Sequence, residues 1–408
     1  MKIVVQKFGG TSVHTPELRE KAAFKLKEAL DEGFAPVAVV SAMGRAGAPY
    51  ATDTLISLAK SEYDELDPRN LDLLMSCGEI ISSVVMVQTL GRIGVKAIAL
   101  TGWQAGIITD ERFGDATIKR VETEKIQKYL EQGYVVVVAG FQGITEEGDV
   151  TTLGRGGSDT SAVVLGVALE ADYVDIFTDV IGVMTADPRI VPEAHILEGL
   201  TYTEAAEIIQ QGAKVIHDKA MNMAREYRVP LRVRSLSDSG KGTLICDIRT
   251  LSNEGMRLFS QNKPVYSIAY RKGLAQIRVK LNGNRENSLK MFQLLAQKEI
   301  SIDLINLFPE TVAFVAEEGK AQKVKDLLEK ENFDLSLTFP CAKISLIGSG
   351  MADRPGVVST MVEALKEVEV EILQTSDSHV TMTCLVNAGD MEKAIQVLHR
   401  KFQLEEIC

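Results

Sequence analysis

The chain has 408 residues, enough for two or three domains with hydrophobic cores of their own. Five scattered cysteines without a C-x-x-C pair argue against a disulfide framework or a zinc site, and favour reduced thiols in the cytoplasm. A formal net charge of −11 argues against a nucleic-acid partner, and we expect neither a signal peptide nor a membrane helix of about 18 apolar residues.

The first stretch of the chain combines three features of an anion site. Residues 3–5 are a β-branched run typical of a buried parallel strand, Gly9-Gly10 predicts a sharp turn, and a helix is expected over residues 16–31. A helix start behind a glycine turn offers backbone N–H groups to an anion. We predict the phosphate end of an ATP site, with Lys7 on the transferred phosphate; the alternative is an ordinary turn with a surface lysine.

A second buried strand is expected over residues 36–40, and it ends in another turn of small residues. Open α/β sheets bind ligands at the carboxyl ends of their strands. Residues 44–54 are therefore interpreted as an active-site loop. Ser41 and Thr52 could donate hydrogen bonds to a substrate there, or could serve only as turn formers.

Glu79 stands out on a long apolar helix expected over residues 71–90. A buried carboxylate is costly unless it is paired. Three partners remain open for Glu79: the end of another helix, an internal salt bridge, or a cationic ligand group such as an ammonium.

Two further strands are expected over residues 95–100 and 134–139, with an amphipathic helix over residues 117–132 between them. A second glycine cluster then opens a helix of small residues. Within it, Arg155 suits a carboxylate or phosphate. Asp159 is an acid beside this anion site. Its presence is explained if it orients Lys7 or lies near a magnesium ion.

A strand over residues 173–177 leads into a polar loop. Thr178 and Asp179 suit a ribose or purine edge, and Arg189 suits a phosphate. After another helix, Lys214 lies in a further turn. These residues are candidates for nucleotide contacts.

The last part of the chain nearly repeats itself. A catalytic domain is expected over residues 1–245. A linker over residues 246–263 is followed by two βαββα units, over residues 264–336 and 337–408, whose strands could interleave. Such units favour an amino-acid sensor, with a structural dimerisation module as the alternative, because each exposes a sheet edge that can pair.

Common catalytic signatures do not occur in the sequence. There is no G-x-x-x-x-G-K-[ST], no H-R-D or D-F-G, and no H-E-x-x-H. A P-loop enzyme and a protein kinase are therefore excluded by motif, and each of the five isolated histidines is expected to be a surface or core residue.

The motifs Lys7-Phe-Gly-Gly-Thr-Ser12, Thr152-Leu-Gly-Arg-Gly-Gly-Ser-Asp159 and Thr178-Asp179 together give a specific likeness. With them, the chain resembles an aspartate kinase of the amino-acid kinase superfamily, of the monofunctional bacterial type, over nearly its full length. The resemblance implies an α/β sandwich with a mainly parallel central sheet, followed by two ferredoxin-like ACT units. It also implies ATP with Mg²⁺ as cofactor, and phosphorylation of the β-carboxylate of L-aspartate as the first step toward lysine, threonine and methionine.

The resemblance also implies roles for individual residues. Lys7 would neutralise the transferring phosphate and Asp159 would position Lys7, while Glu79 would hold the substrate ammonium and Arg155 its α-carboxylate. The implied substrate pocket consists of Ser41, Thr52, Glu79, Phe141, Thr152, Arg155, Gly156 and Ser158. The implied nucleotide contacts are Lys7, Phe8, Gly9, Gly10, Thr178, Asp179, Met184, Arg189, Lys214 and Val215. Met184 and Asp218 depart from the usual family pattern and leave the shape of the nucleotide pocket open.

For regulation, the resemblance implies a homodimer or larger homo-oligomer that binds lysine, threonine or meso-diaminopimelate as an effector. Two alternatives remain at this stage: a kinase of another amino acid, and a non-catalytic subunit that senses amino acids.

Overall fold

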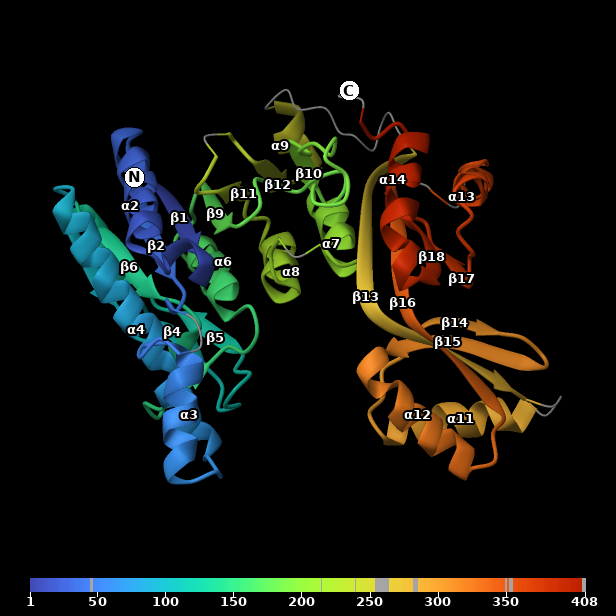
Figure 1. Cartoon of the computed structure of the whole chain (residues 1–408). Coiled ribbons are helices and arrows are strands. Elements are labelled where there is room, and N and C mark those ends of the chain that lie inside the picture. Colours follow the sequence, from blue (N-terminus) through green and yellow to red (C-terminus); the bar gives the residue numbers. More distant parts are fainter. Residues whose placement is uncertain are drawn as a thin grey trace. The chain divides into compact units, whose positions relative to one another are not determined.

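The computed structural model describes residues 1–44, 47–213, 215–238, 240–253, 264–281, 285–348, 351 and 355–405. The chain divides into two compact units (Figure 1). The first comprises Met1–Val183, Ile196–Ile209 and Lys214–Leu258, and the second comprises Met184–His195, Gln210–Ala213 and Phe259–Cys408. Two short segments of the predicted catalytic region, residues 184–195 and 210–213, therefore belong to the second unit.

The first unit is built on an eight-stranded sheet in the order β10-β12-β11-β9-β1-β2-β6-β3, in which only β11 and β12 pair antiparallel. The strands are β1 (Lys2–Phe8), β2 (Phe34–Val40), β3 (Ala97–Leu100), β6 (Val135–Ala139), β9 (Tyr173–Thr178), β10 (Gly199–Thr201), β11 (Leu231–Ser235) and β12 (Thr243–Cys246). The predicted mainly parallel sheet is confirmed.

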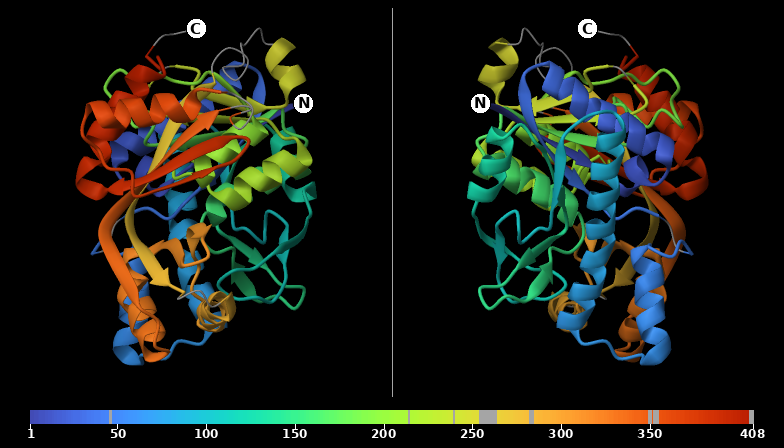
Figure 2. Two further views of the ribbon diagram at one scale, coloured as in Figure 1. Left: turned by 90° about the vertical axis from the view of Figure 1, so that its right-hand side faces the viewer. Right: turned by 90° about the vertical axis from the view of Figure 1, so that its left-hand side faces the viewer.

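Helices cover both faces of this sheet. Those of the first unit are α1 (Gly10–Val13), α2 (Pro16–Asp31), α3 (Thr52–Glu62), α4 (Pro68–Arg92), α5 (Glu124–Glu131), α6 (Gly157–Ala168), α7 (Tyr202–Gln210), α8 (Asp218–Tyr227) and α9 (Ile248–Asn253). The right-hand view of Figure 2 shows α2 and α4 side by side on one face. Because side chains of a strand alternate between faces, Phe8 packs on the α2 side whereas Lys7 faces α6 and pairs with its Asp159.

The expected helix over residues 117–132 is wrong over residues 117–123, since α5 begins only at Glu124. Residues 118–121 form strand β5 (Ile118–Val121), which pairs with β4 (Ile107–Thr109) in a second sheet. That sheet also contains β7 (Gln142–Ile144) and β8 (Val150–Thr152), which pair antiparallel as a hairpin. Branched residues at both ends of 118–121 favour a strand once a partner strand lies beside them, and only the remainder forms α5.

We expected no helix long and apolar enough to span a membrane, but α4 meets that criterion by its length and composition. Its acidic residues Asp72 and Glu79 are nevertheless buried and accept hydrogen bonds. It also packs against β3, β6 and α2. We therefore interpret α4 as a core helix of the first unit.

A buried charge network links three neighbouring strands of the large sheet. Asp175 on β9 is fully buried, and accepts hydrogen bonds from Gln6 Nε2 at 3.0 Å and from Arg232 Nε at 2.7 Å. We expect Asp175→Ala to lower the free energy of unfolding by about 3–5 kcal/mol, because it leaves an arginine without its buried partner. Urea unfolding followed by fluorescence of Trp103, which lies in this unit, measures the change.

The control for this prediction is Asp31→Ala, which removes an exposed ion pair with Lys27 on α2. It should change the same free energy by no more than about 1 kcal/mol. Equal effects of the two substitutions would contradict the assignment of Asp175 as a core residue.

The second unit contains a six-stranded antiparallel sheet in the order β14-β15-β13-β16-β18-β17. Its strands are β13 (Val265–Lys280), β14 (Asp303–Leu307), β15 (Thr311–Glu317), β16 (Leu335–Gly348), β17 (Gln374–Asp377) and β18 (Thr381–Asn387). Its helices are α11 (Arg285–Gln297), α12 (Glu318–Lys330), α13 (Val357–Glu367) and α14 (Met391–Lys401), with the short 3₁₀-helix η2 (Ala388–Asp390).

The two repeats share their longest strands. β13 and β16 pair over nearly their whole length, as Figure 1 shows. The start of β13 packs in the core with α13 and α14, whereas its end packs in the core with α11 and α12. The first strand of the repeat region thus completes the second repeat, and the strands interleave.

Residues 184–195 are anchored in the core of the second repeat. Ala186, Ile190 and Val191 are buried there. The Ile268 N–H donates to the Thr185 carbonyl at 2.8 Å, and the Tyr270 hydroxyl donates to Asp187 at 2.9 Å. This segment includes Met184 and Arg189, two of the predicted nucleotide contacts.

Candidate active site

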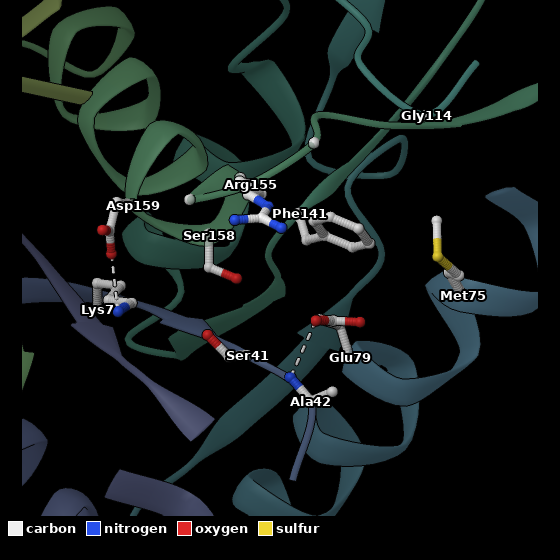
Figure 3. Close-up of a pocket in the computed structure, with 13 residues that line it drawn as sticks. Lys7, Ser41, Ala42, Met75, Glu79, Gly114, Phe141, Arg155, Ser158 and Asp159 are labelled. Atoms are coloured by element: carbon white, nitrogen blue, oxygen red, sulfur yellow. Dashed lines mark hydrogen bonds and ion pairs between the residues drawn. The ribbon is translucent and has the colours of Figure 1, made fainter. Parts of the chain in front are cut away.

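A cavity of about 500 Å³ lies at the carboxyl ends of the central strands of the first unit (Figure 3). This is the edge at which open α/β sheets bind ligands. The cavity is lined by Lys7, Ser41, Ala42, Met75, Glu79, Gly114, Phe141, Gly154, Arg155, Gly156, Gly157, Ser158 and Asp159. The tertiary structure thus brings together all four residues predicted to be catalytic.

Lys7 and Asp159 form an ion pair on one side of the cavity. Lys7 Nζ lies 2.7 Å from Asp159 Oδ1, and the other carboxylate oxygen accepts the His217 N–H at 3.1 Å. Asp159 lies in the first turn of α6, where the helix dipole favours a negative charge. Asp159 thus pairs with the Lys7 ammonium at the rim of the cavity.

Glycines allow the backbone to approach this ion pair. A Cβ atom at Gly156, the N-cap of α6 with φ +70°, would lie within 2.2 Å of the His217 ring. A Cβ atom at Gly9 would lie 3.1 Å from Lys7 Nζ. Gly156 therefore requires glycine, whereas a Cβ atom at Gly9 would demand only a small shift of the Lys7 side chain.

Glu79 lies on α4, at the other side of the cavity, and is only 6% exposed. Its Oε1 accepts the Ala42 N–H at 3.0 Å, whereas Oε2 has no hydrogen-bond partner among the described residues. Burial raises the pKa of Glu79 to about 7, against the lowering effect of the Ala42 hydrogen bond. Glu79 lines the cavity across from Arg155, as Figure 3 shows, and its second oxygen is buried. A buried carboxylate of this kind is stabilised by a cationic partner.

Arg155 and Phe141 enclose the same space. The Arg155 guanidinium is directed into the cavity from the glycine loop, across from Glu79 (Figure 3). Phe141 adopts φ +69°, a conformation that costs a bulky residue about 1–3 kcal/mol. It is held there because its N–H donates to Ser161 Oγ at 3.0 Å and its carbonyl accepts the Leu153 N–H at 2.9 Å. Ser41, Gly156 and Ser158 line the cavity as predicted.

Two residues predicted for the substrate pocket lie elsewhere. Thr152 is fully buried, and its hydroxyl donates to Asp72 Oδ1 at 2.8 Å. Thr52 begins α3 and is not among the residues that line the cavity. The motif identifies the right loop, but the alternation of side chains along β8 turns Thr152 away from the cavity.

The predicted nucleotide contacts divide into several groups. Phe8 is a core residue, fully buried and stacked on Phe177 with ring centroids 4.9 Å apart, so its side chain is corrected from a contact to a packing role. Gly9 and Gly10 lead into α1, and Thr178 ends β9 with its hydroxyl donating to Asp179 at 3.1 Å. Val215 is buried, and Lys214 lies outside the described residues.

The remaining two nucleotide candidates, Met184 and Arg189, belong to the second unit. The Arg189 side chain is 84% exposed and binds Asp187 at 2.7 Å. This hydrogen bond is the main reason why the pKa of Asp187 falls to about 2.

Sequence reasoning missed Asp72, Met75 and Gly114. Asp72 could have been noticed, because it lies seven residues before Glu79 and thus on the same face of the apolar helix. Gly114 could not, because the segment around it was expected to precede a helix and not to form a hairpin against the glycine loop.

Comparison with known proteins places this site in a family. Residues 2–235 match the Amino acid kinase family and residues 337–400 match the ACT domain. Aspartokinase 1 of Bacillus subtilis (strain 168) is 45% identical over 407 residues, which is 100% of both chains.

The chain belongs to the aspartokinases of the amino acid kinase family.

Other relatives agree with this membership. The aspartokinase of Geobacillus stearothermophilus is 37% identical over 413 residues, covering 100% of this chain and 98% of the relative. The crystal structure of E. coli aspartokinase III in complex with aspartate and ADP is 26% identical, with a TM-score of 0.76 over 98% of this chain and 99% of that chain. The predicted family, its α/β kinase fold and the C-terminal ACT fold are confirmed.

Proposed function

We propose that the cavity binds L-aspartate and that the chain transfers the terminal phosphoryl group of ATP to the β-carboxylate, forming 4-phospho-L-aspartate. The observation that carries this proposal is the buried Glu79 carboxylate, with one oxygen free of partners among the described residues, across from Arg155. An anion site and a cation site on opposite walls suit the ammonium and α-carboxylate of an amino acid. The name of the aspartate- and ADP-bound E. coli relative supports the same pair of substrates.

The chemistry needs positioning and charge neutralisation more than a base. A β-carboxylate with a pKa of about 4 is already ionised at neutral pH, so it needs no proton acceptor before it attacks. Two anions must meet, and Lys7 supplies a positive charge beside the cavity, held by Asp159. The N-terminus of α6, whose first residues Gly157 and Ser158 line the cavity, adds backbone N–H groups for phosphate oxygens.

We propose Mg²⁺ as the partner of the nucleotide, held mainly by phosphate oxygens. Among the described residues, no group of three or more His, Cys, Asp or Glu side chains could hold a metal ion. Magnesium often binds through one or two carboxylates plus substrate phosphates, so the absence of such a group in this part of the chain fits a metal that arrives with ATP.

An acceptor screen tests the function. Purified protein with ATP, Mg²⁺ and hydroxylamine should form the hydroxamate with L-aspartate, and much less with L-glutamate or N-acetyl-L-glutamate. Preference for another acceptor would overturn the assignment of aspartate. Failure to consume ATP with any acceptor would favour a non-catalytic sensing subunit, against which the intact pair of Lys7 and Asp159 argues.

We propose that an end product such as lysine, threonine or meso-diaminopimelate binds the ACT repeats of a cytoplasmic homo-oligomer and inhibits the enzyme. The E. coli relative has been crystallised with lysine and aspartate, in a form named the T-state. In this chain, residues 184–195 follow strand β9 and pack in the ACT core. The Tyr270 hydroxyl of the ACT sheet donates a hydrogen bond to Asp187 of this segment. Such a covalently connected segment can couple effector binding to the nucleotide site.

Tyr270→Phe tests this coupling. It removes a hydrogen bond to a carboxylate, and we expect the effector concentration for half-inhibition to change about two- to tenfold while kcat without effector stays near the wild-type value. Inhibition curves with each of the three candidate effectors measure it. Tyr227→Phe, on an exposed side chain at the end of α8, is the control. Identical inhibition curves for the wild type and Tyr270→Phe would count against this route.

A further inference from the structure

Asp72 has no role in the site described so far, yet it is fully buried on α4. It precedes Glu79 by seven residues, two helical turns, on the same face of the helix. From its contacts we infer that Asp72 is a positioning residue, which sets the separation between the ammonium site at Glu79 and the carboxylate site at Arg155. The inference rests on the proposed function.

The Asp72 carboxylate joins three segments. Its Oδ2 accepts the Gly114 N–H at 2.9 Å and the Thr152 N–H at 2.8 Å. Its Oδ1 accepts the Thr152 hydroxyl at 2.8 Å. One side chain of α4 thus binds both the loop between β4 and β5 and the end of β8.

These segments form the wall of the cavity across from Glu79. Thr152 is three residues before Arg155, and Gly114 itself lines the cavity. The two loops also contact each other, because Ala116 N–H donates to the Thr152 carbonyl at 2.9 Å and a Cβ atom at Gly154 would lie 3.2 Å from the Gly114 carbonyl oxygen. A shift of the Asp72 contacts would therefore move the loop that carries Arg155 relative to the helix that carries Glu79.

The chemistry of the three donors requires a carboxylate at this position. Two backbone N–H groups and one hydroxyl converge on it, and an ionised carboxylate accepts all three. An asparagine has one oxygen for the two backbone N–H groups, and its N–H₂ group would face the Thr152 hydroxyl, which would have to change from donor to acceptor and leave its own proton without the Asp72 acceptor. Buried donors without an acceptor are costly, so the loops would shift to regain partners.

Asp175 offers a matched control for burial alone. It is equally buried and lies in the same unit, but its partners Gln6 and Arg232 belong to the central sheet and do not line the cavity. Asp175→Asn should lower the unfolding temperature without changing the Michaelis constants.

The experiment compares Asp72→Asn, Thr152→Val and Asp175→Asn by steady-state kinetics and by calorimetric titration of L-aspartate. We expect Asp72→Asn to raise KM and Kd for aspartate about tenfold to a hundredfold, the effect of misplacing a binding group by about 1 Å. The KM for ATP should change less than about twofold, since Asp72 does not contact the Lys7 side of the cavity. Thr152→Val should shift the aspartate constants in the same direction by a smaller factor.

Wild-type aspartate KM and Kd in Asp72→Asn would overturn the inference, as would equal increases of KM for aspartate and ATP. If Asp72→Asn does not fold, Thr152→Val decides, because unchanged aspartate constants in that variant would also overturn it. Absence of aspartate-dependent ATP consumption in the wild type would instead overturn the proposed function. The two failures are thus distinguishable.

Discussion

Lys7→Ala should lower kcat for aspartate phosphorylation by about 10²- to 10³-fold, the loss expected when one preorganised partner of developing charge is removed. The reason is the position of Lys7 Nζ, 2.7 Å from Asp159 and at the edge of the cavity, where a transferring phosphoryl group would carry its charge. The KM for aspartate should change little, because Glu79 and Arg155 remain. Initial rates over a range of aspartate concentrations measure both constants.

Two variants sharpen this prediction. Asp159→Asn keeps the lysine but removes the ion pair, and should lower kcat by a smaller factor than Lys7→Ala. Lys25→Ala on α2 removes a lysine that pairs with Glu28, away from the cavity, and should leave kcat unchanged. Near-normal turnover in Lys7→Ala would remove this residue from phosphoryl transfer.

Glu79→Gln should raise KM for L-aspartate about tenfold to a hundredfold, because a hydrogen bond between two charged groups is replaced by a weaker neutral one. Its effect should fall on KM more than on kcat, since the ammonium is bound in the ground state and in the transition state alike. Glutamine keeps the size of the side chain and an acceptor for the Ala42 N–H, which limits the effect on folding. A wild-type KM in this variant would exclude Glu79 from the ammonium site.

The raised pKa of Glu79 adds a pH dependence that the Gln variant should lose. As the pH falls through about 7, Glu79 becomes protonated and neutral, so KM for aspartate should rise in the wild type. For stability the sign is opposite: because the folded pKa lies above the unfolded value, the contribution is present at low pH and is lost as the pH rises through about 7. The unfolding temperature of the ligand-free wild type should therefore fall between about pH 4.5 and about pH 7 relative to Glu79→Gln, and added aspartate should reduce the difference.

Local signals in the sequence were sufficient for the elements that carry the chemistry. Helix α2 begins behind Thr15, whose side chain accepts the Leu18 N–H as a cap, and the β-branched runs of β1 and β2 form buried parallel strands. Glycine turns, caps and apolar periodicity act over a few residues, so they can be recognised without knowledge of the fold. The same applies to Lys7, Arg155 and Asp159, whose motifs are short.

The remaining features of the fold and of the site depend on contacts between segments that are distant in the sequence. Residues 118–121 became a strand because β4 lies beside them, and Phe8 became a core residue because Phe177, far away in the chain, stacks on it. Asp72 and Thr152 are hydrogen-bonded although they lie 80 positions apart in the sequence, and no local sequence pattern around either residue predicts that contact. Hydrogen bonds and packing between distant segments depend on how the strands are ordered in the sheet, and one sequence without its fold does not contain that order in any local pattern. The chemical groups of the site could thus be predicted from the sequence. Their spacing, and the buried Asp72 carboxylate that we infer to maintain that spacing, became apparent only in the tertiary structure.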